Sequence, residues 1–161
     1  MRTIKRRRKE NKTDYKKRRN MLKGKIPRVV FRKTNKYLIA QYIASIEAQD
    51  HIKIGTNSKQ LLKHGWPKEG ENSLKSTPAS YLLGILIGKE IQKRKLDVPI
   101  IDFGLQRVLK KTKMHAFIKG LIDSGLAIKI KKGFFPNEDR LQGKHMKIKI
   151  NIEDIKSNIL K

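Results

Sequence analysis

Two short apolar runs separated by a polar stretch begin the hydrophobic part of the chain. Val29–Phe31 and Tyr37–Ala40 flank Arg32–Lys36, a polar stretch in which Asn35 is a common turn residue. A weaker alternation of polar and apolar residues follows a few positions later. The pattern predicts a hairpin and a third strand, with strands over 29–33, 37–47 and from 50 onward and a turn over 34–36.

Two segments in the second half of the chain have the spacing of amphipathic helices. Leu83, Ile87 and Ile91 recur every four residues, within a helix that we expect to begin at Thr77 as its cap and to end near Lys95. A second helix is expected over 113–124, because its apolar residues follow the i, i+3, i+4 template: Met114, Phe117, Ile118, Leu121 and Ile122.

Gly84 and Gly88 lie one helical turn apart in the first of these helices. A Gly-x-x-x-Gly pair can mark helix dimerisation in a membrane. The apolar run here is too short for that reading, and Lys89 and Glu90 follow at once. We therefore expect the two glycines to allow close packing of this helix on a sheet.

The order of the expected elements defines the fold class. A short buried strand is expected over 98–103 and a last one over 127–130, with short helices within 59–63 and after 154. The βββαβα order predicts an α/β fold with a mixed sheet, two helices packed on one face, and a basic extended N-terminal arm. The other face of the sheet is then open for a ligand. The expected domains are an arm over 1–25, a mixed α/β domain over 26–145 and a C-terminal tail over 146–161.

Charge changes this picture most strongly. The 161 residues include 40 Lys and Arg against 14 Asp and Glu, a formal charge of +26. Such an excess repels itself in a compact chain, and a polyanionic partner is the simplest reason to tolerate it. At 37% apolar residues a modest core is available. There is no cysteine, no apolar h-region at the start and no run of eighteen apolar residues, so we expect a soluble, intracellular chain.

The first 25 residues concentrate this charge. They hold 13 Lys and Arg against two acids, Glu10 and Asp14, and their few apolar residues make no stripe at helical spacing. We expect the arm to be disordered alone and to become ordered on a polyanion. The alternative is a solvated tail or a localisation signal, although the basic stretch is longer than the usual signal cluster.

Catalytic signals are weak. The four histidines, at positions 51, 64, 115 and 145, show no metal-ligand spacing with one another or with a carboxylate, and no phosphate-binding Gly-x-x-x-x-Gly-Lys loop occurs. The candidate acids are Asp102, Asp123 and the Glu138–Asp139 pair. A metal-dependent RNA-processing nuclease using Asp102 and a loop carboxylate is the alternative function, because such an enzyme needs converging carboxylates. A basic membrane-surface protein is a third reading, but the arm lacks an amphipathic face.

RNA binding accounts for more of the sequence. Lysine and arginine neutralise phosphates and release counterions, which supplies much of the affinity. Tyr15, Tyr37 and Trp66 lie among cations, where aromatic rings can stack on unpaired bases. For Tyr37 and Trp66 the alternative is ordinary packing.

Six stretches then resemble one known family: RRRKENKTDYKKR, PRVVFRKTNKYLIAQ, GW, TPASYLLGILIGK, DFGLQR and FPNEDRLQGKH. They occur in the same order as in the universal large-subunit ribosomal protein family eighteen, whose members bind 5S ribosomal RNA (5S rRNA), and they span about Arg6 to His145. Gly65-Trp66 and the FPNEDR segment resemble the archaeal and eukaryotic branch. The short stretch after His145 lacks the long eukaryotic extension, so the chain resembles an archaeal member.

The resemblance implies a non-enzymatic, structural role without a cofactor. Members bind 5S rRNA and help attach it to the 23S-type large-subunit rRNA in the central protuberance. The implied location is the cytoplasmic large ribosomal subunit. Neighbouring ribosomal proteins, including the other 5S-binding protein, are the implied protein partners; no membrane and no homo-oligomer are expected.

The resemblance also implies three groups of RNA-binding residues. Those of the arm are Arg6, Arg7, Arg8, Lys12, Tyr15, Arg18 and Arg19. Those of the hairpin are Arg28, Arg32, Lys33, Asn35, Lys36 and Gln41, and those near the C-terminus are Arg140, Lys144 and His145. On this hypothesis the hairpin turn is cationic because it is a binding surface. The alternative is that its lysines protect an exposed sheet edge against aggregation.

Overall fold

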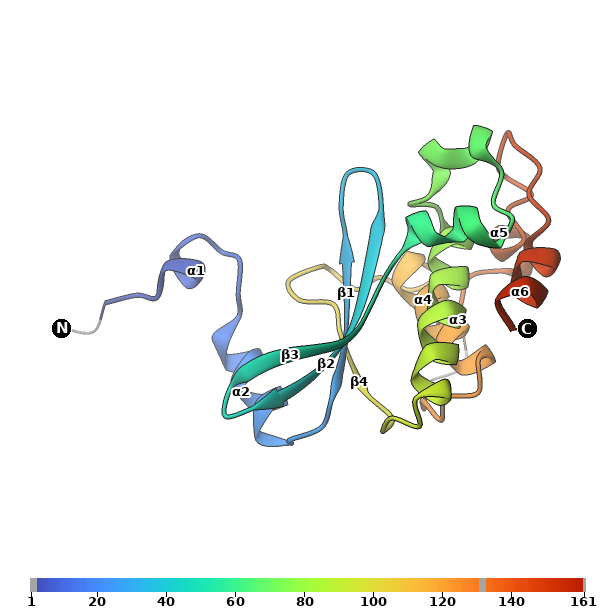
Figure 1. Ribbon diagram of the computed structural model, residues 1–161. Coiled ribbons are helices and arrows are strands. Elements are labelled where there is room, and N and C mark those ends of the chain that lie inside the picture. Colours follow the sequence, from blue (N-terminus) through green and yellow to red (C-terminus); the bar gives the residue numbers. More distant parts are fainter. Residues whose placement is uncertain (1–2, 131–132, 161) are drawn as a thin grey trace.

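A four-stranded sheet lies in the middle of the molecule in the computed structural model, which describes residues 3–130 and 133–160 (Figure 1). Its strands are β1 (Arg28–Lys33), β2 (Leu38–Ile46), β3 (Gln49–Asn57) and β4 (Ile100–Asp102), in the order β3-β2-β1-β4. β2 is antiparallel to both β1 and β3, whereas β4 is parallel to β1. The predicted mixed α/β sheet is confirmed.

Strand alternation divides the sheet into two unlike faces. Val29 and Phe31 of β1 are buried beside Leu38, Ala40 and Tyr42 of β2, because every second side chain points to the same side. The residues between them point to the opposite face. One face of the sheet is therefore apolar and covered by helices, and the other is available to polar residues.

Helices α3 (Thr77–Lys93) and α4 (Lys113–Asp123) cover the apolar face. Both ranges agree with the helices predicted from spacing. The cap of α3 is Ser76 and not Thr77 as predicted, because the Ser76 side chain accepts the backbone N–H of Ala79 while Thr77 already lies in the helix.

The two glycines of α3 allow a close contact, but the prediction that they pack on the sheet is wrong. A methyl group on Gly84 would collide with the carbonyl oxygen of Phe117, and one on Gly88 would collide with Ser124. Gly120 of α4 is equally close to the backbone of α3. These residues belong to α4 and the residue after it, so the glycines bring the two helices together.

A second apolar cluster lies on the side of α3 away from the first. It joins Trp66, Leu82 and Ile85 to the last helix, α6 (Ile152–Leu160), whose Ile155 and neighbouring isoleucines are buried. The 3₁₀ helices η1 (Ser58–His64) and η2 (Lys68–Ser73) and the short helix α5 (Glu138–Leu141) complete this side. The helix predicted after 154 is present, but it starts at Ile152 and contributes to the core.

Two other segments differ from expectation. Residues 127–130 form no strand, since Ile128 and Ile130 pack against the first cluster without joining the sheet. Residues of the arm, predicted to be extended and disordered alone, form helices α1 (Arg6–Lys9) and α2 (Tyr15–Lys23). None of the helices in the described ranges is long and apolar enough to cross a membrane.

Candidate nucleic-acid interface

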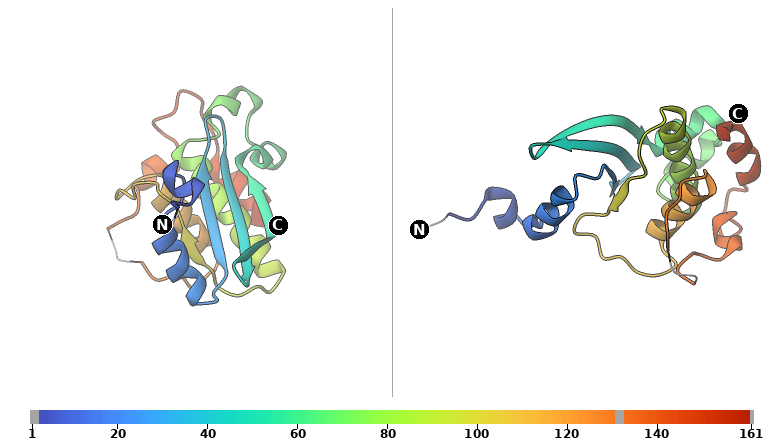
Figure 2. Two further views of the ribbon diagram at one scale, coloured as in Figure 1. Left: turned by 90° about the vertical axis from the view of Figure 1, so that its left-hand side faces the viewer. Right: turned by 90° about the horizontal axis from the view of Figure 1, so that it is seen from below.

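Helix α2 of the arm lies beside the helix-free face of the sheet (Figure 2). It starts at Tyr15 because the Asp14 carboxylate accepts the backbone N–H groups of Lys16 and Lys17. The Lys17 ammonium then donates to the carbonyl of Gly104, just beyond β4, over 3.3 Å. Local capping and one long-range contact thus order a segment whose apolar pattern alone predicts no helix.

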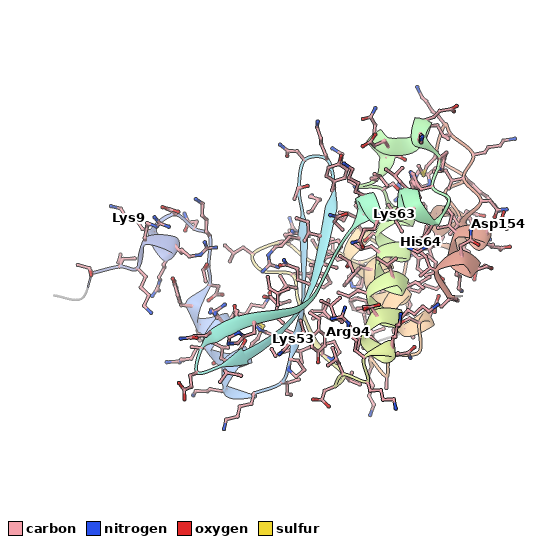
Figure 3. All side chains as sticks on the ribbon, in the orientation of Figure 1. Lys9, Lys53, Lys63, His64, Arg94 and Asp154 are labelled. Atoms are coloured by element: carbon pink, nitrogen blue, oxygen red, sulfur yellow. The ribbon has the colours of Figure 1, made fainter. Side chains whose placement is uncertain are left out.

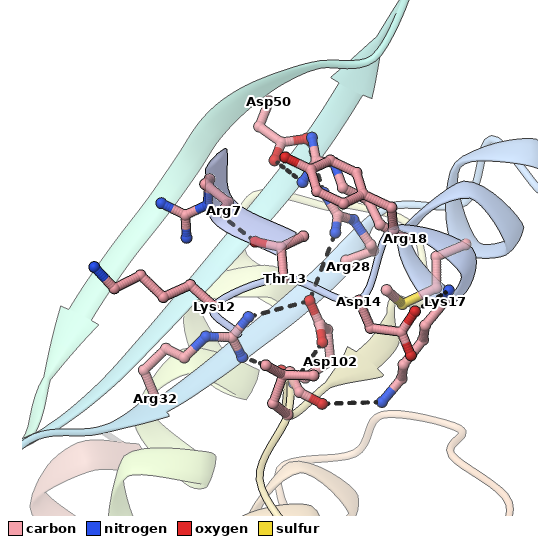
Figure 4. A pocket seen from close by; sticks show the side chains of 14 residues that line it. Arg7, Lys12, Thr13, Asp14, Lys17, Arg18, Arg28, Arg32, Asp50 and Asp102 are labelled. Atoms are coloured by element: carbon pink, nitrogen blue, oxygen red, sulfur yellow. Dashed lines mark hydrogen bonds and ion pairs between the residues drawn. The ribbon is translucent and has the colours of Figure 1, made fainter. Parts of the chain in front are cut away.

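A chain of five alternating charges fixes the arm to the sheet (Figure 4). Arg18 of α2 reaches Asp50 of β3 over 2.8 Å, and Asp50 reaches Arg28 of β1 over another 2.8 Å. Arg28 lies 3.6 Å from Asp102 of β4, which also pairs with Arg32 over 3.3 Å. We call these five residues the charge chain. It links the arm to three of the four strands.

Asp50 is the acid between Arg18 and Arg28 in the charge chain. Burial acts to raise the pKa of its carboxyl group. Hydrogen bonds from Arg18 and Ser45, together with the charges of Arg28 and Arg18, outweigh that effect and hold the pKa below its ordinary value. Asp50 therefore stays ionised at neutral pH and keeps both arginines in place.

Three predicted RNA-binding arginines, Arg18, Arg28 and Arg32, are engaged inside this network. The Arg28 side chain is only 3% exposed and faces carboxylates and the Ser45 hydroxyl. Arg32 is 41% exposed, but its guanidinium donates to the carbonyl oxygens of Phe31 and Asp102. In this conformation Arg28 holds Asp50 and Asp102 beneath the surface and is not accessible to RNA. We therefore do not include Arg28 among the residues proposed to contact RNA.

The remaining arm cations lie outside the charge chain. Arg6, Arg7 and Arg8 are exposed on α1, and Arg19 is exposed on α2. Lys12 pairs with Glu10 over 2.9 Å. The arm and the sheet enclose an open cleft of about 480 Å³ that cations line from both sides (Figure 4).

Tyr15 and Tyr37, two of the aromatic candidates, are placed differently. The Lys5 ammonium lies 4.9 Å from the centre of the Tyr15 ring, a cation–π contact that leaves Tyr15 among the arm cations. The half-buried Tyr37 donates its hydroxyl to Glu71 over 3.2 Å. Trp66 is 2% exposed and donates to the carbonyl of Gly70, so the packing reading of Trp66 is confirmed.

The tip of the β1–β2 hairpin is a second exposed cationic surface. Lys33, Asn35 and Lys36 are all exposed there. The Thr34 hydroxyl accepts the backbone N–H of Tyr37 and donates to its carbonyl, which closes the turn. Gln41 lies further along β2, half-buried on the helix-free face. The sequence thus places the predicted hairpin residues on one strand pair, with the cations at its tip.

The three C-terminal candidates lie elsewhere. Arg140 belongs to α5, and Lys144 pairs with Asp139. The ribbon places the C-terminal segment at the opposite end of the molecule from the arm (Figures 1 and 2). The structure therefore does not bring Arg140, Lys144 and His145 together with the arm residues.

The carboxylates of the nuclease alternative are far from forming one site. Asp102 contacts two arginines, whereas Asp123 accepts a 2.6 Å hydrogen bond from the Tyr81 hydroxyl. Within residues 3–130 and 133–160, no three His, Cys, Asp or Glu side chains gather as a metal site would require. No observation favours the nuclease reading.

Other cations form groups that the sequence did not indicate. Arg94, directly after α3, donates to the carbonyl of Lys53 on β3, and His64 of η1 lines the same pocket as these two residues (Figure 3). Lys75 donates to the carbonyl of Asn35 at the hairpin tip over 2.9 Å. Lys75 lies in a polar loop without a motif, so only its three-dimensional contact identifies it.

The sequence of this chain matches a known protein family. A family model described as "Ribosomal large subunit proteins 60S L5, and 50S L18" matches residues 1–98. The chain belongs to this family. The matched part contains the arm, the hairpin, β3 and all of α3.

Individual relatives cover more of the chain. The large ribosomal subunit protein uL18 of Korarchaeum cryptofilum is 39% identical over 88% of this chain and 70% of its own length. The protein of the same name from Caldivirga maquilingensis is 40% identical over 88% and 67%, and that of Methanoregula boonei 36% over 88% and 79%. These relatives confirm the predicted archaeal-type membership and identify a structural protein of the large ribosomal subunit.

Proposed function

We propose that this large-subunit ribosomal protein binds 5S rRNA and helps attach it to the large-subunit rRNA in the central protuberance. The observation that carries the proposal is the charge chain. It uses Arg18, Arg28 and Arg32 to hold the arm on the sheet, and Arg7, Lys12 and Lys17 of the arm line the cleft beside it.

Two surfaces supply the contacts in this proposal. The arm, residues 1–25, contributes Arg6, Arg7, Arg8, Lys12, Tyr15, Arg18 and Arg19, and the domain over 26–145 contributes Arg32, Lys33, Asn35, Lys36 and Gln41. Lysine and arginine side chains neutralise phosphates, and the exposed Asn35 amide and Tyr15 ring offer hydrogen bonding and stacking to unpaired bases. The arm and hairpin face the 5S rRNA in this arrangement.

The C-terminal side serves a separate role in the proposal. Arg140, Lys144 and His145 lie at the far end of the molecule and contact RNA there, namely the large-subunit rRNA; the neighbouring ribosomal proteins, including the other 5S-binding protein, are separate partners. The segment over 146–161 supports this side through α6. The protein acts by holding its partners together and performs no catalysis.

Binding to 5S rRNA across a salt series, with transfer RNA as competitor, tests the proposal. Each neutralised phosphate steepens the log–log salt slope by roughly 0.7 to 0.9. We expect binding that survives the competitor near physiological salt and weakens when residues 1–25 are removed. Equal affinity for both RNAs, lost together as salt rises, would leave a nonspecific polycation and contradict the proposal.

A further inference from the structure

Three lysines from distant parts of the sequence lie close to one another beside the hairpin tip. Phe31, two residues before Lys33 on the same face of β1, packs on Phe117, which lies one helical turn after Lys113, with ring centroids 4.6 Å apart. Lys33 ends β1, Lys75 precedes α3, and Lys113 is the first residue of α4. Lys75 donates to the carbonyl of Asn35 at the tip, two residues after Lys33, over 2.9 Å. We call these three residues the lysine cluster.

A hydrogen bond between the helices positions the third lysine. The Ser80 hydroxyl of α3 donates to the backbone carbonyl of Lys113 over 2.6 Å. Ser80 lies little more than one helical turn after Lys75, so the start of α4 is fixed against the start of α3. Gly84 and Gly120 keep the two helices in close contact beyond this point. The cluster is therefore supported by rigid elements.

The three charges raise one another's energy. Burial lowers the pKa of the half-buried Lys113 ammonium, and the charges of Lys33 and Lys75 lower it further. Lys113 also occupies a helix N-terminus, where the backbone dipoles disfavour a cation. Within the described part of the chain no member of the cluster forms an ion pair.

An acid beside the hairpin tip is already engaged. Glu71 lines the same shallow pocket as Lys75 and Asn35, and it accepts the Tyr37 hydroxyl over 3.2 Å. It leaves the cluster with an excess of positive charge. Lys33 and Lys75 are exposed, so an external anion has access to the cluster.

We propose that Lys33, Lys75 and Lys113 form a binding site for one phosphate group of an RNA backbone. Phosphate fits because each of the three ammonium groups is a hydrogen-bond donor and a phosphate group offers several charged acceptor oxygens. A protein chain offers only scattered carboxylates, whereas the cationic hairpin tip beside the cluster already suits a continuous line of phosphates. This inference rests on the proposed function and adds two residues, Lys75 and Lys113, to its interface.

Substitution of one lysine at a time tests the site in the full-length protein. Lys113→Gln and Lys75→Gln are compared with Lys119→Gln, a half-buried lysine on α4 outside the cluster. We expect each cluster variant to bind 5S rRNA roughly tenfold more weakly than wild type, as loss of a charged hydrogen bond would produce. The log–log salt slope should fall by about 0.7 to 0.9, and Lys119→Gln should change neither quantity.

Lys113→Gln should not impair folding, because it removes a positive charge that lies close to two others. The variant should unfold at a temperature equal to or above that of wild type. A Lys113→Gln protein that binds like Lys119→Gln would overturn the phosphate site and leave 5S rRNA binding intact. If wild type fails to prefer 5S rRNA over transfer RNA, the proposed function fails. The site then stands only if the cluster variants weaken binding to both RNAs relative to Lys119→Gln.

Nuclear magnetic resonance titration of the Lys113 ammonium identifies the source of the phosphate. We expect stoichiometric 5S rRNA to raise the pKa of Lys113, and inorganic phosphate to do so only at far higher concentration. If inorganic phosphate raises the pKa of Lys113 at a lower concentration than the phosphate groups of 5S rRNA do, the site binds free phosphate. That result would overturn RNA as the source. No rise with either probe would overturn the site.

Discussion

Arg18 on α2 and Asp50 on β3 form a 2.8 Å ion pair that joins the basic arm to the sheet. Asp50 also neutralises Arg28, whose side chain is almost fully buried. One carboxylate therefore holds a surface cation on one side and an interior cation on the other. The two halves of this arrangement should respond differently to substitution.

Asp50→Asn should destabilise the whole fold, whereas Arg18→Ala should release only the arm. Removing the Asp50 charge leaves Arg28 with the more distant Asp102, and we expect a loss of about 2 kcal/mol in the free energy of unfolding. Arg18→Ala breaks a partly exposed pair and should cost at most about 1 kcal/mol. Urea unfolding measures the first effect, and limited proteolysis of the arm measures the second. Arg19→Ala serves as the control; equal stabilities of the Asp50 and Arg19 variants would contradict the role of Asp50.

Acid should detach the arm before it unfolds the sheet. The pKa of Asp50 in the folded protein is below its ordinary value of 3.8, so its contribution is present above that value. The contribution is lost as the pH falls through the depressed folded pKa. We expect proteolysis of the arm by an acid-active protease such as pepsin to rise only below about pH 4. In the Asp50→Asn protein the protease sensitivity of the arm should be high throughout; a wild-type transition near pH 6 would require another group.

Gly84→Ala should destabilise the protein although alanine favours helices. Helix propensity alone predicts a gain of about 1 kcal/mol. The new methyl group would meet the Phe117 carbonyl, which belongs to the backbone of α4 and has no side-chain freedom to move. We expect a net loss of about 2 kcal/mol from overpacking, measured by denaturant unfolding. Gly55→Ala, where the added methyl has room, should lose less, and a more stable Gly84→Ala protein would disprove the close helix contact.

Ile155→Ala should show that the C-terminal segment belongs to the core. Ile155 is 2% exposed in the cluster that also contains Trp66. Truncation of a buried isoleucine costs roughly 2 to 5 kcal/mol, and Trp66 fluorescence should report the same unfolding transition. Ser157→Ala, on the exposed side of α6, should be neutral. If Ile155→Ala is neutral as well, α6 does not pack as described.

Two readings of the cationic hairpin tip lead to opposite results for Lys33→Ala combined with Lys36→Ala. If the tip binds phosphates, affinity for 5S rRNA should fall by roughly tenfold or more while solubility is kept. If the lysines protect a sheet edge, solubility should fall and affinity should stay. Binding assays and the concentration at which the protein aggregates separate the two. Lys59→Ala combined with Lys63→Ala on η1 removes the same charge at another place and controls for net charge.

The periodicity of apolar residues was sufficient to predict the main helices and strands, because the side chains that must be buried recur with the period of the element. The β1–β2 hairpin and helices α3 and α4 follow from apolar spacing, and their bounds agree closely with expectation. The β2–β3 turn carries no such signal. Glu47 and Ala48 both have positive φ there, a conformation usually supplied by Asn and Gly. The pairing of the flanking strands overrides that local preference.

Contacts between distant residues could not be predicted in the same way. No spacing rule relates Arg18 to Asp50, or Lys75 to Asn35, because each pair comes into contact only after the sheet and helices have formed. Burial of Arg28 was missed for the same reason, since an arginine at the start of a strand in a basic chain resembles a surface residue until its two carboxylates are placed. The family resemblance suggested which positions bind RNA. It could not indicate which of those cations form ion pairs inside the folded protein.

The contribution of α6 to the second apolar cluster has a consequence for synthesis of the chain. The buried members of the first cluster end with Leu126, whereas the second needs Ile152, Ile155 and Ile159. Chains fold from the N-terminus during translation. The sheet with its arm and hairpin can therefore assemble on a nascent chain while the second cluster still lacks its closing helix. The part of the protein that carries the proposed RNA interface is synthesised first, and α6 completes the second apolar cluster last.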